Sequence, residues 1–249
     1  MYWFEIVLLV VIGIVLPLLG LRELPRMRRR IAAGDRDVRI KAYRSTMLVQ
    51  WGLTAITLGY WWTSDRSWAA IGLGAPTTGP TLWIVGAATL GAGAFLVGQV
   101  RSVRRDAEVR DAARAQLRPV ADLLPHDDRE LRRFMLLSLT AGTCEEVLYR
   151  GFAIAILAPH VTVWGAVALA AAVFAFGHAY QGVTSALKIG VLGLVLGAMY
   201  VLTEALWLPM LLHVALDVTS GQVAASVLRA GATPAGDVEP DPPAAGERA

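Results

Sequence analysis

The sequence predicts an all-α fold: a polytopic membrane helical bundle of about seven transmembrane helices plus an amphipathic cytoplasmic helix. Three observations predict it. Of the 249 residues, 55% are hydrophobic and 17% are charged, and the mean hydropathy is +0.52, whereas soluble domains average about 45–50% apolar and about 25% charged residues. The apolar residues gather into runs of about 20, the length of a helix that crosses a bilayer. The basic residues are concentrated between these runs.

The predicted spans follow one another along the chain. The first, residues 2–21, has no basic segment before it and no small-residue cleavage site, so we expect an uncleaved helix rather than a signal peptide. The second, residues 45–62, ends in Trp61 and Trp62, which suit a membrane–water interface. The remaining spans are predicted at residues 80–100, 134–157, 161–179, 184–202 and 206–228.

Glycines in two of these spans indicate close helix packing. Small residues let the backbones of membrane helices approach one another. We therefore expect Gly193 and Gly197 to lie in a helix contact. The same use is expected for four glycines of the third span: Gly86, Gly91, Gly93 and Gly98.

Two basic segments predict the orientation of the chain. Nine of the 23 Lys and Arg residues lie at positions 22–44 and nine at positions 101–133. The positive-inside rule places both in the cytoplasm, so we expect a multi-pass protein of the cell membrane with its N-terminus outside and its C-terminus cytoplasmic. Because topology explains the basic residues, the lipid bilayer is the expected partner and nucleic acid is not. Apolar residues of the second segment predict the amphipathic surface helix: Val109, Ala112, Ala113, Leu117, Val120 and Leu124.

A potential metal cluster and a potential cysteine nucleophile have simpler explanations. Asp127 or Asp128, next to His126, is expected to cap the helix that follows. Cys144 is the only cysteine, which excludes an internal disulfide and a multi-thiolate site. A thiol in an apolar helix is a poor nucleophile, so Cys144 is expected to serve packing.

Ionisable side chains within the later spans need a different explanation. Each costs at least ~2.5–3.5 kcal/mol at membrane depth, so such groups normally face a protein interior or a wet cavity. Glu146 and Arg150 are i,i+4 neighbours and can neutralise each other, whereas Glu145 has no partner in its own helix. His213 and Asp217 also have i,i+4 spacing, which puts both side chains on one helical face. We expect the six groups to share one polar site: Glu145, Glu146, Arg150, His178, His213 and Asp217.

Hydrolysis is the chemistry that these groups favour. A carboxylate beside an imidazole can hold a water and take its proton, and a histidine with a second donor can stabilise an oxyanion. The metal alternative uses Glu145, His178 and His213 as zinc ligands with an open fourth position, although HExxH is absent. Two other classes stay open: a proton or ion pathway, since carboxylates and histidines form relays, and a non-catalytic membrane scaffold or immunity protein.

Three motifs stand in order on successive predicted spans: Glu145-Glu146-x-x-x-Arg150, Phe174-x-x-x-His178 and His213-x-x-x-Asp217. Together they resemble the motifs of the CPBP family, the type II CAAX prenyl endopeptidases and bacteriocin-processing or Abi proteins. These are intramembrane proteases. The resemblance covers roughly residues 129–228 and implies a hydrolase, glutamate-dependent or metal-dependent, that acts on a membrane-associated protein or peptide.

The resemblance also implies a role for each residue. Glu145 and His178 would activate the water, and Glu146 with Arg150 would brace the site. His213 and Asp217 would hold the oxyanion or help to bind a metal; no cofactor is implied with certainty, and Zn²⁺ is the candidate. The prenyl proteases have asparagine where this chain has Asp217. Because an ionised aspartate cannot donate a hydrogen bond, Asp217 must be protonated, orient His213 or contact a metal.

Three regions follow from these expectations. Residues 1–128 are N-terminal membrane helices with two basic cytoplasmic segments. Residues 129–228 are a CPBP-like catalytic helical core. Residues 229–249, rich in Pro, Ala, Gly and acidic residues, are expected to form a disordered cytoplasmic tail.

Overall fold

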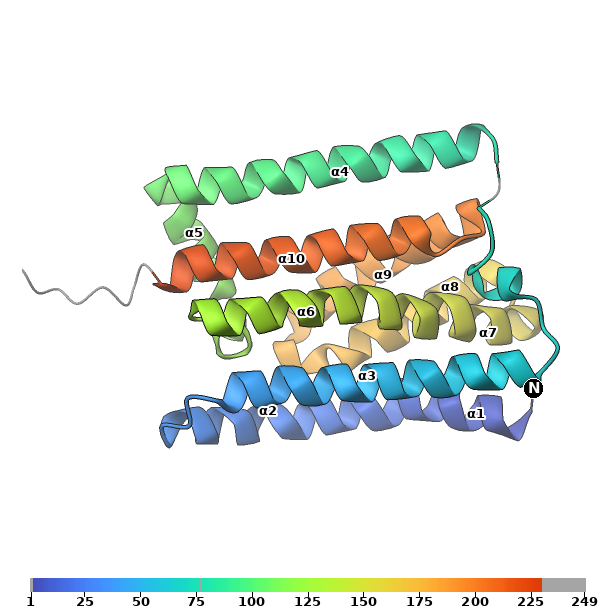
Figure 1. The fold of residues 1–249 in the computed structure, drawn as a ribbon, viewed down its shortest axis with the longest axis horizontal. Coiled ribbons are helices and arrows are strands. Elements are labelled where there is room, and N and C mark those ends of the chain that lie inside the picture. Colours follow the sequence, from blue (N-terminus) through green and yellow to red (C-terminus); the bar gives the residue numbers. More distant parts are fainter. Residues whose placement is uncertain (1, 77, 230–249) are drawn as a thin grey trace, which may run out of the picture.

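The computed structural model describes residues 2–76 and 78–229, and within these ranges every regular element is helical. The predicted all-α class is confirmed. Figure 1 shows long helices aligned with one axis of the molecule, with α3, α6, α10 and α4 in front and α8 and α9 behind them. The predicted tail lies outside the described residues, apart from residue 229.

The first helix is longer than predicted. α1 (Trp3–Val10), a π-helical turn (Val11–Val15) and α2 (Leu16–Ala32) form one continuous rod. The predicted end at residue 21 is therefore wrong. Arginine is a good helix former, so the basic run after that residue continues the helix rather than breaking it. α3 (Val38–Thr63) returns alongside this rod.

The π-helical turn leaves one backbone carbonyl without a partner in its own helix. The Leu16 N–H bonds the Val11 carbonyl, and Pro17, which would serve the Ile12 carbonyl in the same i→i+5 pattern, has no N–H. The hydroxyl of Tyr149 donates to this Ile12 carbonyl at 3.2 Å. The first helix is thereby bonded to a residue next to the predicted site.

The opposite end of α1 is fixed by a buried carboxylate. Glu5 is 1% exposed and accepts from the Arg66 guanidinium at 2.6 Å, the Tyr60 hydroxyl at 3.0 Å and the Tyr2 backbone N–H at 2.8 Å. A buried charge is tolerated only when it is paired and hydrogen-bonded. This network joins the start of the chain to the end of α3 and the loop after it.

α4 (Pro80–Arg105) lies at the edge of the bundle against α10, and α5 (Ala107–Leu117) follows it. A Cβ added at any of the four glycines of α4 would have no neighbouring atom within 4 Å. The expectation that they mediate close packing is wrong, because their spacing does not tell which face of a helix meets a neighbour. A short 3₁₀ segment (Arg118–Leu123) completes the predicted amphipathic region.

The core of the molecule is formed by the later helices. α6 (Asp128–Glu145), a π-helical segment (Glu146–Ala153) and α7 (Ile154–Val161) are continuous. Asp127 caps α6 as predicted, since its Oδ1 accepts from the Glu130 N–H at 2.7 Å. α8 (Val163–Gly177), a 3₁₀ turn (Ala179–Gln181), α9 (Val183–Thr203) and α10 (Trp207–Arg229) follow.

Within residues 2–76 and 78–229, four helices are long and apolar enough to cross a membrane: Trp3–Ala32, Pro80–Arg105, Val183–Thr203 and Trp207–Leu228. They correspond to the first, third, sixth and seventh predicted spans. α8 is apolar but has only 15 residues. The chain thus has several membrane-spanning helices, and the count of seven stays a prediction.

Glycine packing between α8 and α9 gives a test of the fold. A Cβ at Gly197 would lie 2.8 Å from Val167 Cγ1, as the sequence predicts for a helix contact. We expect Gly197→Leu to lower the free energy of unfolding in detergent by about 1–3 kcal/mol through overpacking. Gly98→Leu, on the open face of α4, is the control and should unfold like the unmodified protein. Equal unfolding midpoints for both variants would contradict this contact.

Candidate active site

Five of the six predicted side chains meet where α6 and its π-helical continuation face α10. Glu145 ends α6, Glu146 and Arg150 belong to the π-helical segment, and His213 and Asp217 lie one turn apart on α10. Hydrogen bonds and ion pairs link all five. The sequence expectation that these groups converge is therefore met for this set.

Gly142 lets the two helices approach closely at this point. A Cβ added there would lie 2.8 Å from the backbone nitrogen of Val214 and closer still to the Val214 side chain. Gly142 stands one turn before Glu146, and Val214 is next to His213. Any larger residue would push α10 away, so this glycine positions the histidine against the carboxylates.

Glu146 is the centre of the site. Its Oε1 accepts from Arg150 Nη1 at 2.8 Å and lies 2.7 Å from His213 Nδ1. Glu146 is fully buried and Arg150 is 1% exposed. Arginine is always charged, so its partner is the ionised carboxylate. A carboxylate can only accept, and therefore His213 carries its proton on Nδ1 and donates it to Glu146.

This bond turns the other ring nitrogen of His213 towards two further carboxylates. His213 Nε2 lies 3.8 Å from Glu145 Oε2 and 3.8 Å from Asp217 Oδ2. The Asp217 side chain is 36% exposed and that of Glu145 is 13% exposed, whereas His213 is 5% exposed. The site is thus closed on the Glu146 side and open on the Asp217 side.

Gln50 is a site residue that the sequence analysis missed. Its Nε2 donates to Glu145 Oε1 at 2.6 Å from α3, and the residue is 9% exposed. The bond fixes Glu145 so that Oε2 faces the histidine. An amide inside the apolar run of residues 45–62 was the available signal, although nothing in the sequence shows which way it points.

His178 joins the site through an aromatic ring rather than through a hydrogen bond. It follows α8, and its Nδ1 lies 2.8 Å from the Phe174 carbonyl, which can only accept, so Nδ1 carries the proton and Nε2 is free to act as a base. The centroid of the Phe174 ring lies 4.7 Å from that of the His178 ring, 6.0 Å from that of the His213 ring and 4.3 Å from Arg150 Cζ. Asp217 lies within electrostatic range of both histidines.

The described side chains do not form a grouped set of metal ligands. Across residues 2–76 and 78–229, no three His, Cys, Asp or Glu side chains are grouped to hold a metal ion.

One comparison with known proteins bears on this site. Residues 128–219 match the family model described as type II CAAX prenyl endopeptidase Rce1-like. All three sequence motifs lie inside the matched segment, which confirms the resemblance found in the sequence. No curated protein and no solved structure is significantly similar to the chain.

The buried pair gives a prediction about stability. Glu146→Gln leaves the Arg150 charge uncompensated, so we expect the free energy of unfolding to fall by about 3–5 kcal/mol. Glu23→Gln is the matched control, because Glu23 and its partner Arg26 are 63% and 64% exposed and such pairs contribute less than about 1 kcal/mol. Chemical unfolding in detergent measures both. Similar losses for the two variants would contradict the central role of Glu146.

Proposed function

We propose that the Rce1-like domain of this chain is an intramembrane endopeptidase that hydrolyses a peptide bond of a membrane-associated protein or peptide. One observation supports it above the others. An imidazole nitrogen faces two carboxylates at equal distance, at the partly open side of an otherwise buried polar cluster. Such a set can hold a water, take its proton and stabilise the charge that develops.

Water activation falls to Glu145 and His178. Gln50 occupies one oxygen of Glu145 and leaves the other for a water, and the free Nε2 of His178 is the second base. The water attacks the peptide carbonyl carbon as its proton passes to one of these bases. The same proton then goes to the leaving amine when the C–N bond breaks.

Oxyanion stabilisation falls to His213 and Asp217. Glu146 holds the imidazole by Nδ1, so its Nε2, when protonated, can donate towards the carbonyl oxygen. Asp217 can donate only as the neutral acid. Asp217 lies beside His213 Nε2, where it can donate to the oxyanion as the neutral acid and can also orient the His213 ring.

The basic segments support the proposed orientation, with seven spans, an outside N-terminus and a cytoplasmic C-terminus. They lie at one end of the bundle, where α2 ends and α5 begins (Figure 1). Arg28 and Asp122 pair at 2.9 Å, and Arg129 and Asp37 pair at 2.7 Å. These contacts support a location of both segments on one side of the membrane, which is the cytoplasmic side under the positive-inside rule.

The proposal is tested first at Glu145. Glu145→Gln should lower the rate of cleavage of a membrane-peptide library at least about 10²-fold, because it removes a general base. Cys144→Ala, one residue earlier, should cleave normally and so exclude a thiol nucleophile. Peptide products are measured by mass spectrometry of reactions with purified protein in detergent. A chelator should leave cleavage unchanged.

Three results would each reject this mechanism. They are normal cleavage by Glu145→Gln, loss of cleavage in Cys144→Ala, and loss of cleavage on chelation that added zinc restores. Absence of cleavage by the unmodified protein across the library would favour the ion pathway or the scaffold over the protease.

Gln50 should act as a positioning residue. We expect Gln50→Leu to lower kcat about tenfold or more, since a hydrogen bond to a charged group contributes about 1.5–3 kcal/mol. KM should stay unchanged, because Gln50 touches Glu145 and not the substrate. The Glu23→Gln variant is the kinetic control. A change in KM with constant kcat would show that Gln50 serves binding instead.

A further inference from the structure

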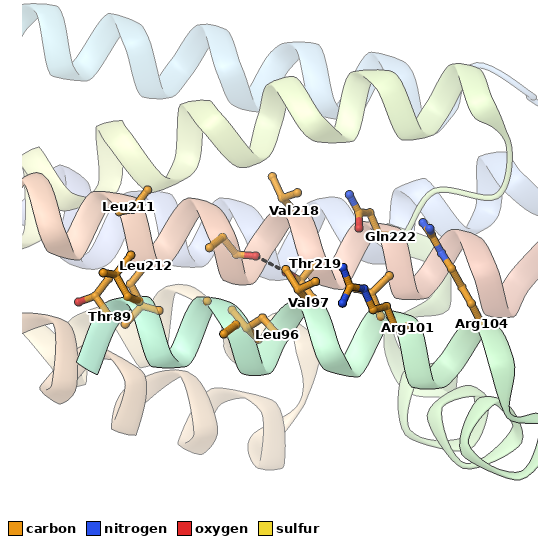
Figure 2. Close-up of a pocket in the computed structure, with 15 residues that line it drawn as sticks. Thr89, Leu96, Val97, Arg101, Arg104, Leu211, Leu212, Val218, Thr219 and Gln222 are labelled. Carbon is orange, nitrogen blue, oxygen red and sulfur yellow. Dashed lines mark hydrogen bonds between the residues drawn. The ribbon is translucent and has the colours of Figure 1, made fainter. Parts of the chain in front are cut away.

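A groove of 540 Å³ runs between α4 and α10 (Figure 2). It extends from Thr89 to Arg104 on α4 and from Leu211 to Gln222 on α10. Fifteen steps along an α-helix at about 1.5 Å each give a length of roughly 22 Å. The groove is therefore long and narrow, and it is separate from the cluster around Glu146.

Most of its wall is apolar. Leu211 and Leu212 line the end near Thr89, and Val218, Leu96 and Val97 line the middle of the groove (Figure 2). The two threonines of the wall offer no free hydroxyl donor, because Thr89 donates to the Val85 carbonyl at 2.8 Å and Thr219 to the Ala215 carbonyl at 2.5 Å. The carbonyl groups of a peptide backbone would find no hydroxyl donor along this stretch.

Gly93 lies beside an open part of the groove. Gly93 lines it, and a Cβ added there would have no atom within 4 Å. α4 and α10 do pack together, so the groove is a gap within a helix contact rather than the outer face of a single helix. An apolar chain is the occupant that fits such a gap.

One end of the groove is cationic. Arg101 and Arg104 are i,i+3 neighbours on α4, and Figure 2 shows both at the same end as Gln222. Among the described residues neither arginine forms an ion pair or hydrogen bond that offsets its charge. Basic pockets between membrane helices on the cytoplasmic side are suited to anionic headgroups.

We propose that this groove binds one anionic phospholipid. Its acyl chain lies along α4 and α10, and its phosphate meets Arg101 and Arg104, with the Gln222 amide beside them. An amphiphile of this kind satisfies both ends of the groove, whereas a second copy of the chain packed by its apolar surface would leave the arginines unpaired. The bound lipid would hold α4 against the helix that carries His213 and Asp217.

Native mass spectrometry of the full chain in detergent tests this site. The probes are phosphatidylglycerol and phosphatidylcholine with the same acyl chains. The unmodified protein should retain phosphatidylglycerol in preference to phosphatidylcholine. The double variant Arg101→Gln/Arg104→Gln should lose roughly 30-fold in affinity for phosphatidylglycerol, from about 1 kcal/mol per basic residue.

Two further variants separate the groove from general surface charge. Arg105→Gln/Arg110→Gln removes the same charge from the same segment outside the groove and should retain phosphatidylglycerol. Gly93→Leu fills the groove without a change in charge and should lower retention of both lipids. Each of these positions lies on an exposed or partly exposed part of the chain, so the variants should fold.

The proposal is overturned by any of three outcomes. The first is retention of phosphatidylglycerol by the Arg101/Arg104 variant, and the second is an equal loss in the Arg105/Arg110 variant. The third is unchanged retention in Gly93→Leu. Lipid retention is measured without substrate, so its failure is distinguishable from failure of the proposed peptidase activity.

Discussion

The arrangement of the helices around the site depends on a single oxygen atom, Oε1 of Glu146. It accepts from Arg150 and from His213, and both donors are almost completely buried. The desolvation of two charges is costly, and the pairing of Glu146 with Arg150 offsets part of that cost, although Glu146 Oε2 and Arg150 Nη2 have no hydrogen-bond partner among the described residues. The consequence is geometric as well as energetic. The π-helical segment, α10 and, through the Phe174 ring over Arg150, α8 all take their relative positions from this one cluster.

The residues proposed to act on substrate are arranged around that cluster and depend on it. Glu146 selects the tautomer of His213, and the Phe174 carbonyl selects that of His178, so each ring offers its Nε2 for chemistry. Gly142 supplies the close approach that makes the first of these bonds possible. The lipid groove lies on the other side of α10, so one helix carries the proposed catalytic histidine on one face and the proposed lipid contact on another.

Sequence reasoning reached the parts of this arrangement that local spacing determines. The i,i+4 pairs, the cap at Asp127 and the membrane character follow from residue type and periodicity, and the structure agrees with them. Long-range contacts were beyond it. The direction of Gln50, the ring contacts of Phe174 with both histidines and the open face of the α4 glycines depend on which helix lies next to which. The extension of the first helix was missed because charge was taken to end it.

The bond from Tyr149 to the Ile12 carbonyl limits how far the catalytic region can be regarded as a portable module. That carbonyl is available only because a π-helical turn precedes Pro17, and Gln50 reaches the site from α3. Both partners lie outside the segment that matches the family model. A chimera that grafts residues 128–219 onto foreign membrane helices would therefore inherit the carboxylates and histidines but lose two of the supports that orient them.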